Sequence, residues 1–547
     1  MQLNKKYLQT FVFFLVYLFA IYFWSQPYQE RKLPYGEYDA MSHFEIGDYM
    51  SFTDKSLTDL PPYIDIRYGT DNKFRPHTLW YPPPFHTTFG IMQVIGGERI
   101  IPVYLMNTIM AAFILVAVYF VINRMFGFFP AILSSFLLIF SPRDFMPYLW
   151  GQWPERFAYA FVPIILYCFY RYFTEYSKES RKPLYLYLTS AFLGMNILVH
   201  PLVFFHSVFG VAVLYFFLWI KQKKLVFDWK HILVSLLIFA VLFMAFPYQT
   251  FNVFSTTEAR SDKGSAFNFN LGRIFQWSLN PDDYKGSVPP SYFSFREMNG
   301  LWTAPFLLAG LAFLLLRREK EDIFILAWLA SLYIVMHRDL FGKSVFLHRS
   351  LSATAHIFIP IAAIGAFYFP SLFSKLWKQA KMEKIGNYAK YVFVFVFIYF
   401  SISVNAVYAG NGSPAPMNKE TYNSPLVTLT EPEYIAADWI MRNVPQQYNV
   451  SVLGVPHYDN YVSTTSRKIR WLGAASQHVT RFYYLLEEEQ KPTYLRNNYV
   501  MLDYNLVLML KDGNLFNDMK KFEETMLSNH TLVYNNNDIK IFKPKQK

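Results

Sequence analysis

Four clusters of ionisable side chains lie in the polar segments of this mostly apolar chain. The first cluster is residues 36–48, in which Asp39 and His43 are four residues apart. If residues 39–53 form a helix, Asp39 lies at or near its N-cap and His43 follows one turn later on the same face. A carboxylate and an imidazole would then lie side by side at the mouth of a helical bundle. The alternative is structural, with Asp39 capping the helix and His43 partly buried.

The second cluster combines an aromatic ring and a histidine with consecutive prolines. Tyr81 precedes Pro82, Pro83 and Pro84, and His86 follows two residues later. Consecutive prolines are expected to forbid a helix and to supply a rigid polyproline entry into the membrane, before the next apolar run. A structural elbow is the plainer interpretation of this cluster.

The third cluster brings two acids into a tryptophan-rich turn. Asp144 and Glu155 flank Trp150, Gln152 and Trp153. Tryptophan rings favour the boundary between membrane and water, so the acids should lie near the membrane surface. Substrate binding is one role for them, and a local ion pair of Arg143 with Asp144 inside an aromatic belt is the alternative.

The fourth cluster is basic and could bind phosphate. It contains Arg338, Lys343, His348 and Arg349, and the last two directly precede an apolar run. An arginine at the start of a helix near the bilayer presents five N–H donors in a fork that matches phosphate oxygens. An arginine that only reaches the lipid headgroups is the other interpretation.

The composition indicates what must hold these clusters in place. Of the 547 residues, 53% are hydrophobic and only 16% are charged, against about 25% in soluble domains. Disorder, collagen, a coiled coil and a disulfide scaffold are excluded by these figures and by the single cysteine, Cys168. The net charge of +12 does not indicate nucleic acid, because the cations punctuate apolar segments, which is typical of membrane proteins.

The apolar segments predict an α-helical polytopic membrane protein. A bilayer core about 30 Å thick needs about 20 apolar residues per helical span. His200-Pro201 interrupts one run, so the spans on either side could be short or broken. About eleven spans are predicted, at residues 7–24, 100–122, 127–142, 157–174, 184–204, 206–220, 231–249, 301–316, 322–337, 351–369 and 389–408.

The positions of the cations predict the orientation. Lys and Arg accumulate in short cytoplasmic loops, and a cytoplasmic N-terminus puts every short basic loop on that side. The long polar stretches 25–99, 250–300 and 409–547 then lie outside the cell membrane. The first span should be a retained anchor, because no small-residue cleavage site follows it.

The chain therefore divides into two predicted domains. Residues 1–408 form the membrane domain, including the external loop 25–99, and residues 409–547 form an extracytoplasmic α/β domain. In the second domain, residues 431–443 have helical apolar spacing. Strands are predicted at residues 449–454, 499–509, 531–534 and 539–542.

All four clusters fall on the predicted outer side, although as many as 300 residues separate them. A transporter tends to place ionisable residues within its spans, near the middle of the membrane. Spans 100–122, 127–142, 301–316 and 389–408 contain almost none. The arrangement favours a reaction at the membrane surface over a path through it.

This layout resembles the GT-C superfamily of membrane glycosyltransferases, which use sugars linked to a polyprenyl phosphate or pyrophosphate. It is similar in particular to archaeal and bacterial relatives of the protein mannosyltransferases and oligosaccharyltransferases. The resemblance rests on acids after the first span, a Tyr-Pro-Pro element before the second, acids in the next external loop, a late external arginine and a C-terminal helix. The matching residues are Glu37, Asp39, His43, Tyr81 to Pro83, Asp144, Glu155, Arg349 and Glu433 to Ile440.

The resemblance implies an inverting transferase that moves a sugar from a polyprenyl-phosphate donor to a glycan, lipid or protein. Asp39 would be the general base, and Arg349, helped by Arg338 or Lys343, would stabilise the departing lipid phosphate. Substrate contacts are expected from the remaining candidates, which are Glu37, His43, Tyr81, His86, Asp144, Gln152, Glu155 and His348.

Two features depart from the pattern of the superfamily. No Trp-Trp-Asp motif of the oligosaccharyltransferase kind occurs in residues 409–547, which favours transfer of a single sugar. Glu37-Tyr38-Asp39 replaces an Asp-x-Asp pair, so a divalent cation (Mg or Mn) on Asp39 and Asp144 is open but not required. The competing hypotheses are a noncatalytic membrane protein whose external domain binds a partner or envelope polymer, and a lipid or ion transporter.

Overall fold

The computed structural model divides into two compact units, which are treated separately below. The first unit is Met1–Ser25, Asn107–Tyr148 and Trp153–Asn418, and the second is Gln26–Met106, Leu149–Gln152 and Lys419–Lys547. The structure describes residues 5–29, 38–52, 82–141, 144, 148, 151–176, 183–247, 303–336, 347–409, 431–445, 448, 450–453, 499–504, 513–536 and 538–545.

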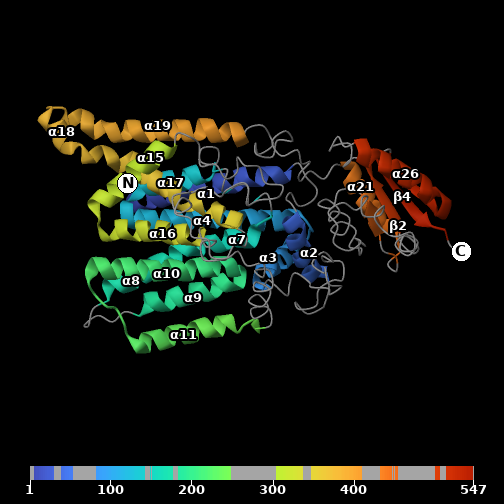
Figure 1. The fold of residues 1–547 in the computed structure, drawn as a ribbon, viewed down its shortest axis with the longest axis horizontal. Coiled ribbons are helices and arrows are strands. Elements are labelled where there is room, and N and C mark those ends of the chain that lie inside the picture. The colour runs from blue at the N-terminus through green and yellow to red at the C-terminus, as the bar shows by residue number, and fades with distance from the viewer. Residues whose placement is uncertain are drawn as a thin grey trace. The chain divides into compact units, whose positions relative to one another are not determined.

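The first unit is a bundle of helices (Figure 1), and every predicted span coincides with helical residues. Its helices are α1 (Lys5–Gln29), α4 (Ile101–Phe126), α5 (Phe128–Leu138), α7 (Trp153–Tyr159), α8 (Phe161–Glu175), α9 (Leu184–Val199), α10 (Pro201–Gln222), α11 (Trp229–Phe243), α15 (Thr303–Arg317), α16 (Lys320–Met336), α17 (Leu347–Leu372), α18 (Ser374–Gln379) and α19 (Glu383–Ala409).

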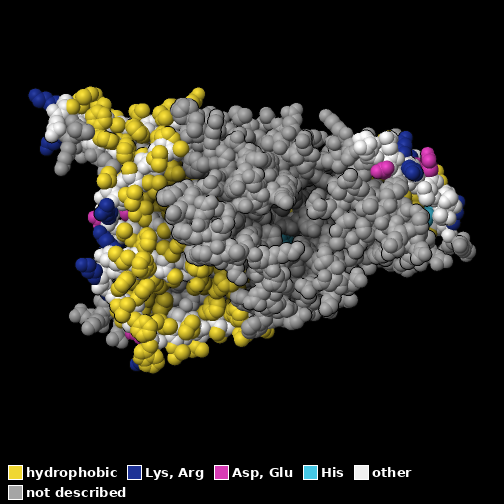
Figure 2. Space-filling view, in the orientation of Figure 1, with side chains coloured by type: hydrophobic (Ala, Val, Ile, Leu, Met, Phe, Trp, Pro, Cys, Tyr) yellow, Lys and Arg dark blue, Asp and Glu magenta, His cyan; other side chains and the backbone are white. Residues whose placement is uncertain are grey.

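The described helices support a multi-pass membrane protein. Five helical segments among them are long and apolar enough to cross a membrane, and four shorter helices are also apolar. Large apolar side chains face outward from α1, α11 and α15, where Phe11, Val241 and Leu316 are 57%, 72% and 69% exposed. Figure 2 shows hydrophobic side chains, in yellow, gathered over the part of the helical unit that is coloured by type. The number of eleven spans and the direction of the termini stay predictions.

Proline sets two helix boundaries in ways that the sequence only partly predicted. The expected break at His200-Pro201 is present, since α9 ends at Val199, His200 is extended and α10 begins at Pro201. The predicted division at residues 204–206 was therefore several residues late. Proline fits the first turn of a helix because the N–H that it lacks has no intrahelical partner there.

The long helix α17 packs into the centre of the bundle. Residues 353–366 along it are buried throughout, and α15 crosses it at Gly310 and Gly365. A Cβ at Gly365 would overlap the carbonyl oxygen of Phe306 and the backbone of Gly310. The two glycines therefore let the helix backbones come into direct contact.

The second unit contains a tight helical pair, α2 (Tyr38–Phe52) and α3 (Pro84–Gly96). They touch at Gly47 and Gly90, where the backbone oxygen of Gly47 would lie 3.1 Å from a Cβ at Gly90. Helix α3 corrects the expectation of an extended proline segment. Pro84 opens a helix here and Pro83 serves as its N-cap residue.

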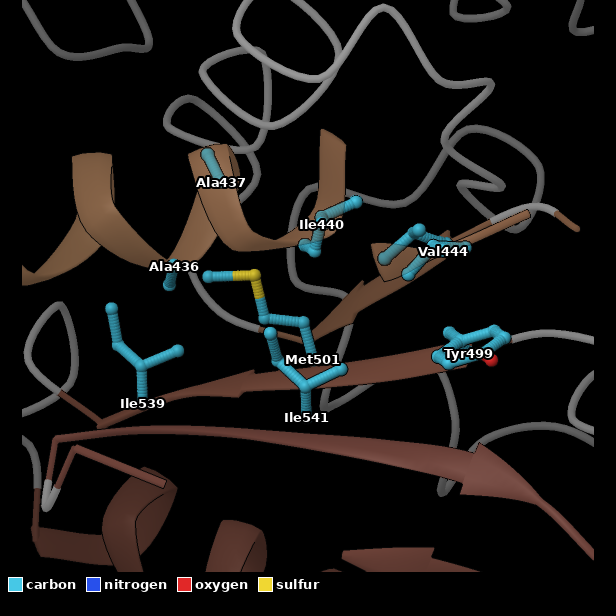
Figure 3. Packing of buried hydrophobic residues seen from close by; sticks show 9 residues of the cluster. Ala436, Ala437, Ile440, Val444, Tyr499, Met501, Ile539 and Ile541 are labelled. Carbon is cyan, nitrogen blue, oxygen red and sulfur yellow. The ribbon is translucent and has the colours of Figure 1, made fainter. Parts of the chain in front are cut away.

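The same unit contains a four-stranded mixed sheet of order β1-β2-β4-β3. Strand β1 (Val450–Leu453) pairs parallel with β2 (Tyr499–Asp503), while β4 (Ile539–Pro544) is antiparallel to both β2 and β3 (His530–Asn535). One face of the sheet packs against α21 (Glu431–Asn443) through Ala436, Ile440, Met501 and Ile541 (Figure 3). Helix α26 (Gly513–Asn529) adds buried Met519, Phe522 and Met526.

Candidate functional site

Several predicted site residues can be located only in part. Four of them lie outside the described residues: Glu37, Tyr81, Arg338 and Lys343. Three more have a described helical backbone but no described side chain: Asp39 in the first turn of α2, and His348 and Arg349 in the first turn of α17. The roles of these seven residues stay predictions.

Two predicted residues of the second unit meet directly. His43 of α2 and His86 of α3 are 3% and 0% exposed, and Nδ1 of His43 lies 2.8 Å from Nε2 of His86. A hydrogen bond between two ring nitrogens uses one hydrogen, so the two tautomers are coupled. His43 is one helical turn after Asp39, and the pair therefore fixes α2 just beyond the predicted base.

A charged network holds the other end of this helical pair. The buried Asp48 of α2 accepts hydrogen bonds from Nε and Nη2 of Arg99, both at 2.9 Å, and from Nε2 of Gln93 at 3.1 Å. Gln93 also donates to the carbonyl oxygen of Arg99 at 2.7 Å. These bonds fasten α2 to the turn that follows α3.

In the first unit, Asp144 forms a buried cluster with two residues that the sequence analysis did not select. Nε and Nη2 of Arg156 donate to the Asp144 carboxylate at 3.0 and 2.7 Å. Nε2 of His356 lies 2.7 Å from Oδ1 of the same carboxylate. All three side chains are at most 2% exposed. Both oxygens of Asp144 are thus engaged within the protein.

Arg156 also stacks on aromatic rings of the bundle. Its guanidinium carbon lies 4.1 Å from the ring centroid of Trp24 on α1 and 5.1 Å from that of Tyr148. The Tyr148 hydroxyl donates to the backbone oxygen of Trp24 at 3.0 Å. Buried cation–π contacts of this kind strengthen as water is removed. The cluster therefore ties α1, α7 and α17 to the connection between α5 and α7.

The electrostatics of the cluster keep Asp144 charged. Burial alone would raise the pKa of its carboxyl group, but Arg156 and His356 outweigh burial and hold that pKa well below its usual range. A carboxylate can only accept hydrogen bonds. His356 must therefore donate through Nε2.

The remaining predicted residues of this turn are also buried. Glu155 on α7 is 1% exposed, and its Oε2 lies 3.9 Å from Nε2 of His200, the residue between α9 and α10. Gln152, which belongs to the second unit, is 7% exposed. Their predicted contacts with a substrate stay untested.

Helix α17 relates the predicted phosphate-binding residue to the Asp144 cluster. Arg349 and His356 are seven residues apart on this helix, which is two turns and about 10 Å along the axis. Positions seven apart lie on similar sides of a helix. The first turn of α17 is therefore close to the connection that carries Asp144.

A signal for the missed residues was present in the sequence. His356 lies inside the predicted span 351–369, and ionisable residues within spans deserve a functional hypothesis. His206 in the next predicted span after His200 carried the same signal. Arg156 directly follows Glu155, but nothing local indicates that it would bind Asp144.

The divalent cation on Asp39 and Asp144 stays a prediction, because the side chain of Asp39 is not described. Among the described residues, no group of three or more His, Cys, Asp or Glu side chains is arranged to hold a metal ion. Asp144 would also have to exchange Arg156 and His356 for the cation. No step below depends on a metal.

Comparison with known proteins identifies the class of fold. The profile of the family described as dolichyl-phosphate-mannose-protein mannosyltransferase matches residues 81–248. No curated protein is significantly similar in sequence. The fold nevertheless matches solved membrane glycosyltransferases, so the fold that the sequence resemblance implied is confirmed.

Two solved structures make the likeness specific. One is the archaeal oligosaccharyltransferase AglB from Archaeoglobus fulgidus in complex with an inhibitory peptide and a dolichol-phosphate. The two chains are 13% identical and superpose with a TM-score of 0.61, and the match covers 99% of this chain and 75% of AglB. The other is ArnT from Cupriavidus metallidurans bound to undecaprenyl phosphate, with 13% identity, a TM-score of 0.55, and coverage of 96% and 97%. At this identity the likeness establishes the fold.

Proposed function

We propose that the chain is an inverting glycosyltransferase that moves one sugar from a polyprenyl-phosphate donor to a glycan, lipid or protein acceptor on the outer side of the cell membrane. The observation that carries this proposal is the fold match over nearly the whole chain to two proteins solved with polyprenyl-type phosphates. An enzyme outside the cytoplasm has no nucleotide-sugar supply, so a lipid-activated donor suits the site.

The proposed reaction is a single displacement. Asp39 takes the proton of the acceptor hydroxyl while its oxygen attacks the anomeric carbon. The bond from that carbon to the donor phosphate breaks, and the lipid phosphate leaves with the electron pair. Arg349, with Arg338 or Lys343, neutralises the charge that develops on the phosphate.

The helix ends support this assignment of roles. Asp39 lies in the first turn of α2, a helix fastened by the His43–His86 bond and by Asp48 with Arg99. Arg349 lies in the first turn of α17, whose next turns are buried in the bundle. Rigid helices hold a base and a phosphate ligand more accurately than loops do.

The decisive variant is Asp39→Asn, because it preserves the shape of the side chain and removes the base. We expect kcat for transfer from polyprenyl-phosphate hexoses to fall by about 10²- to 10⁴-fold with thermal stability unchanged. Asp438→Asn is the matched control, since Asp438 lies in a surface ion pair of α21. A variant at Asp39 that keeps substantial activity would remove this residue from the base role.

Arg349→Gln tests the phosphate site in the same assay. We expect the KM for the donor to rise and turnover to slow, because a neutral amide cannot neutralise the leaving phosphate. Arg318→Gln, at an exposed position after α15, is the control. Unchanged kinetics in the Arg349 variant would move the phosphate site elsewhere.

A further inference from the structure

A small cavity with a mostly apolar lining and a few polar groups lies inside the helical bundle, next to His356. Its volume is about 20 Å³, which is room for about one or two waters. Helices α7, α10, α16 and α17 contribute its main lining residues, which are Tyr159, His206, Trp328, Ser331, Ala353 and His356. Each of these side chains is at most 5% exposed.

The cavity lies near the first turn of α17, which carries Arg349, and near the start of α10. His206 is five residues after Pro201, where α10 begins, and Ala353 is four residues after Arg349 on α17. Helical rise places these lining residues about 6 to 8 Å from those positions. The cavity is thus about one turn deeper in the bundle than the predicted phosphate ligand.

The hydrogen bonds of His356 and Ser331 determine which donors and acceptors face this cavity. Nε2 of His356 donates to the ionised Asp144 at 2.7 Å, and this is the single hydrogen bond of the side chain within the described part of the chain. In the tautomer that carries its hydrogen on Nε2, Nδ1 of the ring is an acceptor. Ser331 Oγ donates to the backbone oxygen of Trp328 at 2.8 Å, so its lone pairs also remain able to accept.

The polar groups therefore suit a hydroxyl better than a phosphate. A sugar hydroxyl can donate to His356 Nδ1 or Ser331 Oγ, whereas an ionised phosphate oxygen has no hydrogen to offer them. The ring of Trp328 supplies an apolar wall for the carbon face of a sugar.

We infer that this cavity is a subsite for a hydroxyl or hydroxymethyl group of the lipid-linked sugar. The inference rests on the proposed function and adds the part of the donor that the bundle recognises. His356 and Ser331 accept the hydrogen bond, and Asp144 and Arg156 fix the ring of His356.

The test compares the affinity of the full chain for two lipids, undecaprenyl phosphate and the same lipid carrying mannose or glucose. Ser331→Ala removes one acceptor, and His356→Gln keeps an N–H donor for Asp144 while it removes the ring nitrogen. Ser134→Ala is the matched control, because Ser134 is buried, its Oγ also donates to a helix carbonyl and it does not line the cavity.

We expect both cavity variants to bind the sugar-bearing lipid about 3- to 10-fold more weakly, as the loss of one hydrogen bond implies. Their affinity for undecaprenyl phosphate should stay within about twofold of the wild type, and the Ser134 control should change neither. Equal weakening for both lipids, or no change for either, would overturn the inference and leave the cavity to ordered water.

A failure of the proposed function would have a different signature. The wild-type chain would then transfer no sugar from any polyprenyl-phosphate hexose and would not distinguish the sugar-bearing lipids from the bare one. An active wild type whose Ser331 and His356 variants are unchanged would refute the subsite alone.

Discussion

Replacing Arg156 by methionine should destabilise the protein strongly, because it leaves the fully buried carboxylate of Asp144 with His356 as its partner. Methionine fills similar space without a charge. Removing one partner of a buried ion pair typically costs about 3–5 kcal/mol, and the stacking of Arg156 on Trp24 is lost as well. We therefore expect Arg156→Met to lower the stability of the protein more than a substitution of an exposed residue does.

The assay is thermal unfolding of the full chain in detergent, followed by fluorescence. The shift in Tm per kcal/mol falls with size and is about 2 °C or less above 250 residues, so Arg156→Met should lower the Tm by several degrees. Arg442→Met is the matched control, since this arginine forms an exposed i,i+4 pair with Asp438 at 2.9 Å. Exposed pairs of this kind contribute about 0–1 kcal/mol.

The double variant Asp144→Asn with Arg156→Met separates pairing from packing. Because both charges are removed together, it should unfold at a higher temperature than the sum of the two single variants implies. A coupling of about 1–3 kcal/mol is expected for residues in one buried network. Strict additivity, or an Arg156 variant as stable as the Arg442 control, would refute the view that a buried ion pair organises this turn.

The dependence on pH follows from the lowered pKa of Asp144. A carboxyl group whose pKa is lower in the folded state stabilises the protein above its unfolded pKa of about 3.9. That contribution is lost as the pH falls toward the lower folded pKa, where both states bind the proton. The stability difference between the wild type and Asp144→Asn should therefore be constant from pH 7 to about pH 5 and narrow below about pH 4.

Two further substitutions test the close packing and the second unit. Gly365→Ala should lower the Tm, since the added methyl group overlaps the backbone of α15 and overpacking costs about 1–3 kcal/mol, whereas Gly513→Ala should have little effect because nothing lies within 4 Å of the new Cβ. Asp48→Asn should destabilise the α2–α3 pair by about 1.5–3 kcal/mol, because it weakens the hydrogen bonds from Arg99. Amide hydrogen exchange in α2 measures this loss directly, with Asp438→Asn as the control. Unchanged protection of α2 would argue against the network.

The sequence predicted the positions of the helices well, because a run of apolar residues long enough to enter a membrane leaves the backbone few alternatives to a helix. The break at His200-Pro201 was predictable for the same local reason. Helix α3 was missed because consecutive prolines were interpreted as extended chain, although proline is well tolerated in the first turn of a helix.

The contacts of the candidate site were much less predictable. Asp144 and His356 are 212 residues apart, and His43 and His86 are 43 apart. No spacing rule connects such positions, since the bonds depend on how helices pack and not on the period of one helix. The sequence did contain one indication of the site, because His356 is an ionisable residue inside an apolar span.

The burial of Asp144 changes how acids in the external turns of such a chain should be interpreted. A carboxylate near a membrane surface is costly to bury alone, so finding one suggests a function. Asp144 offsets that cost with Arg156 and His356, and its charge thereby fixes a histidine ring at the edge of a cavity. An acid can thus serve a binding site without touching the ligand, and the residue that faces the ligand is then the histidine. Under the proposed subsite the contact with the sugar is made by His356, and a direct contact of Asp144 with a substrate stays a prediction.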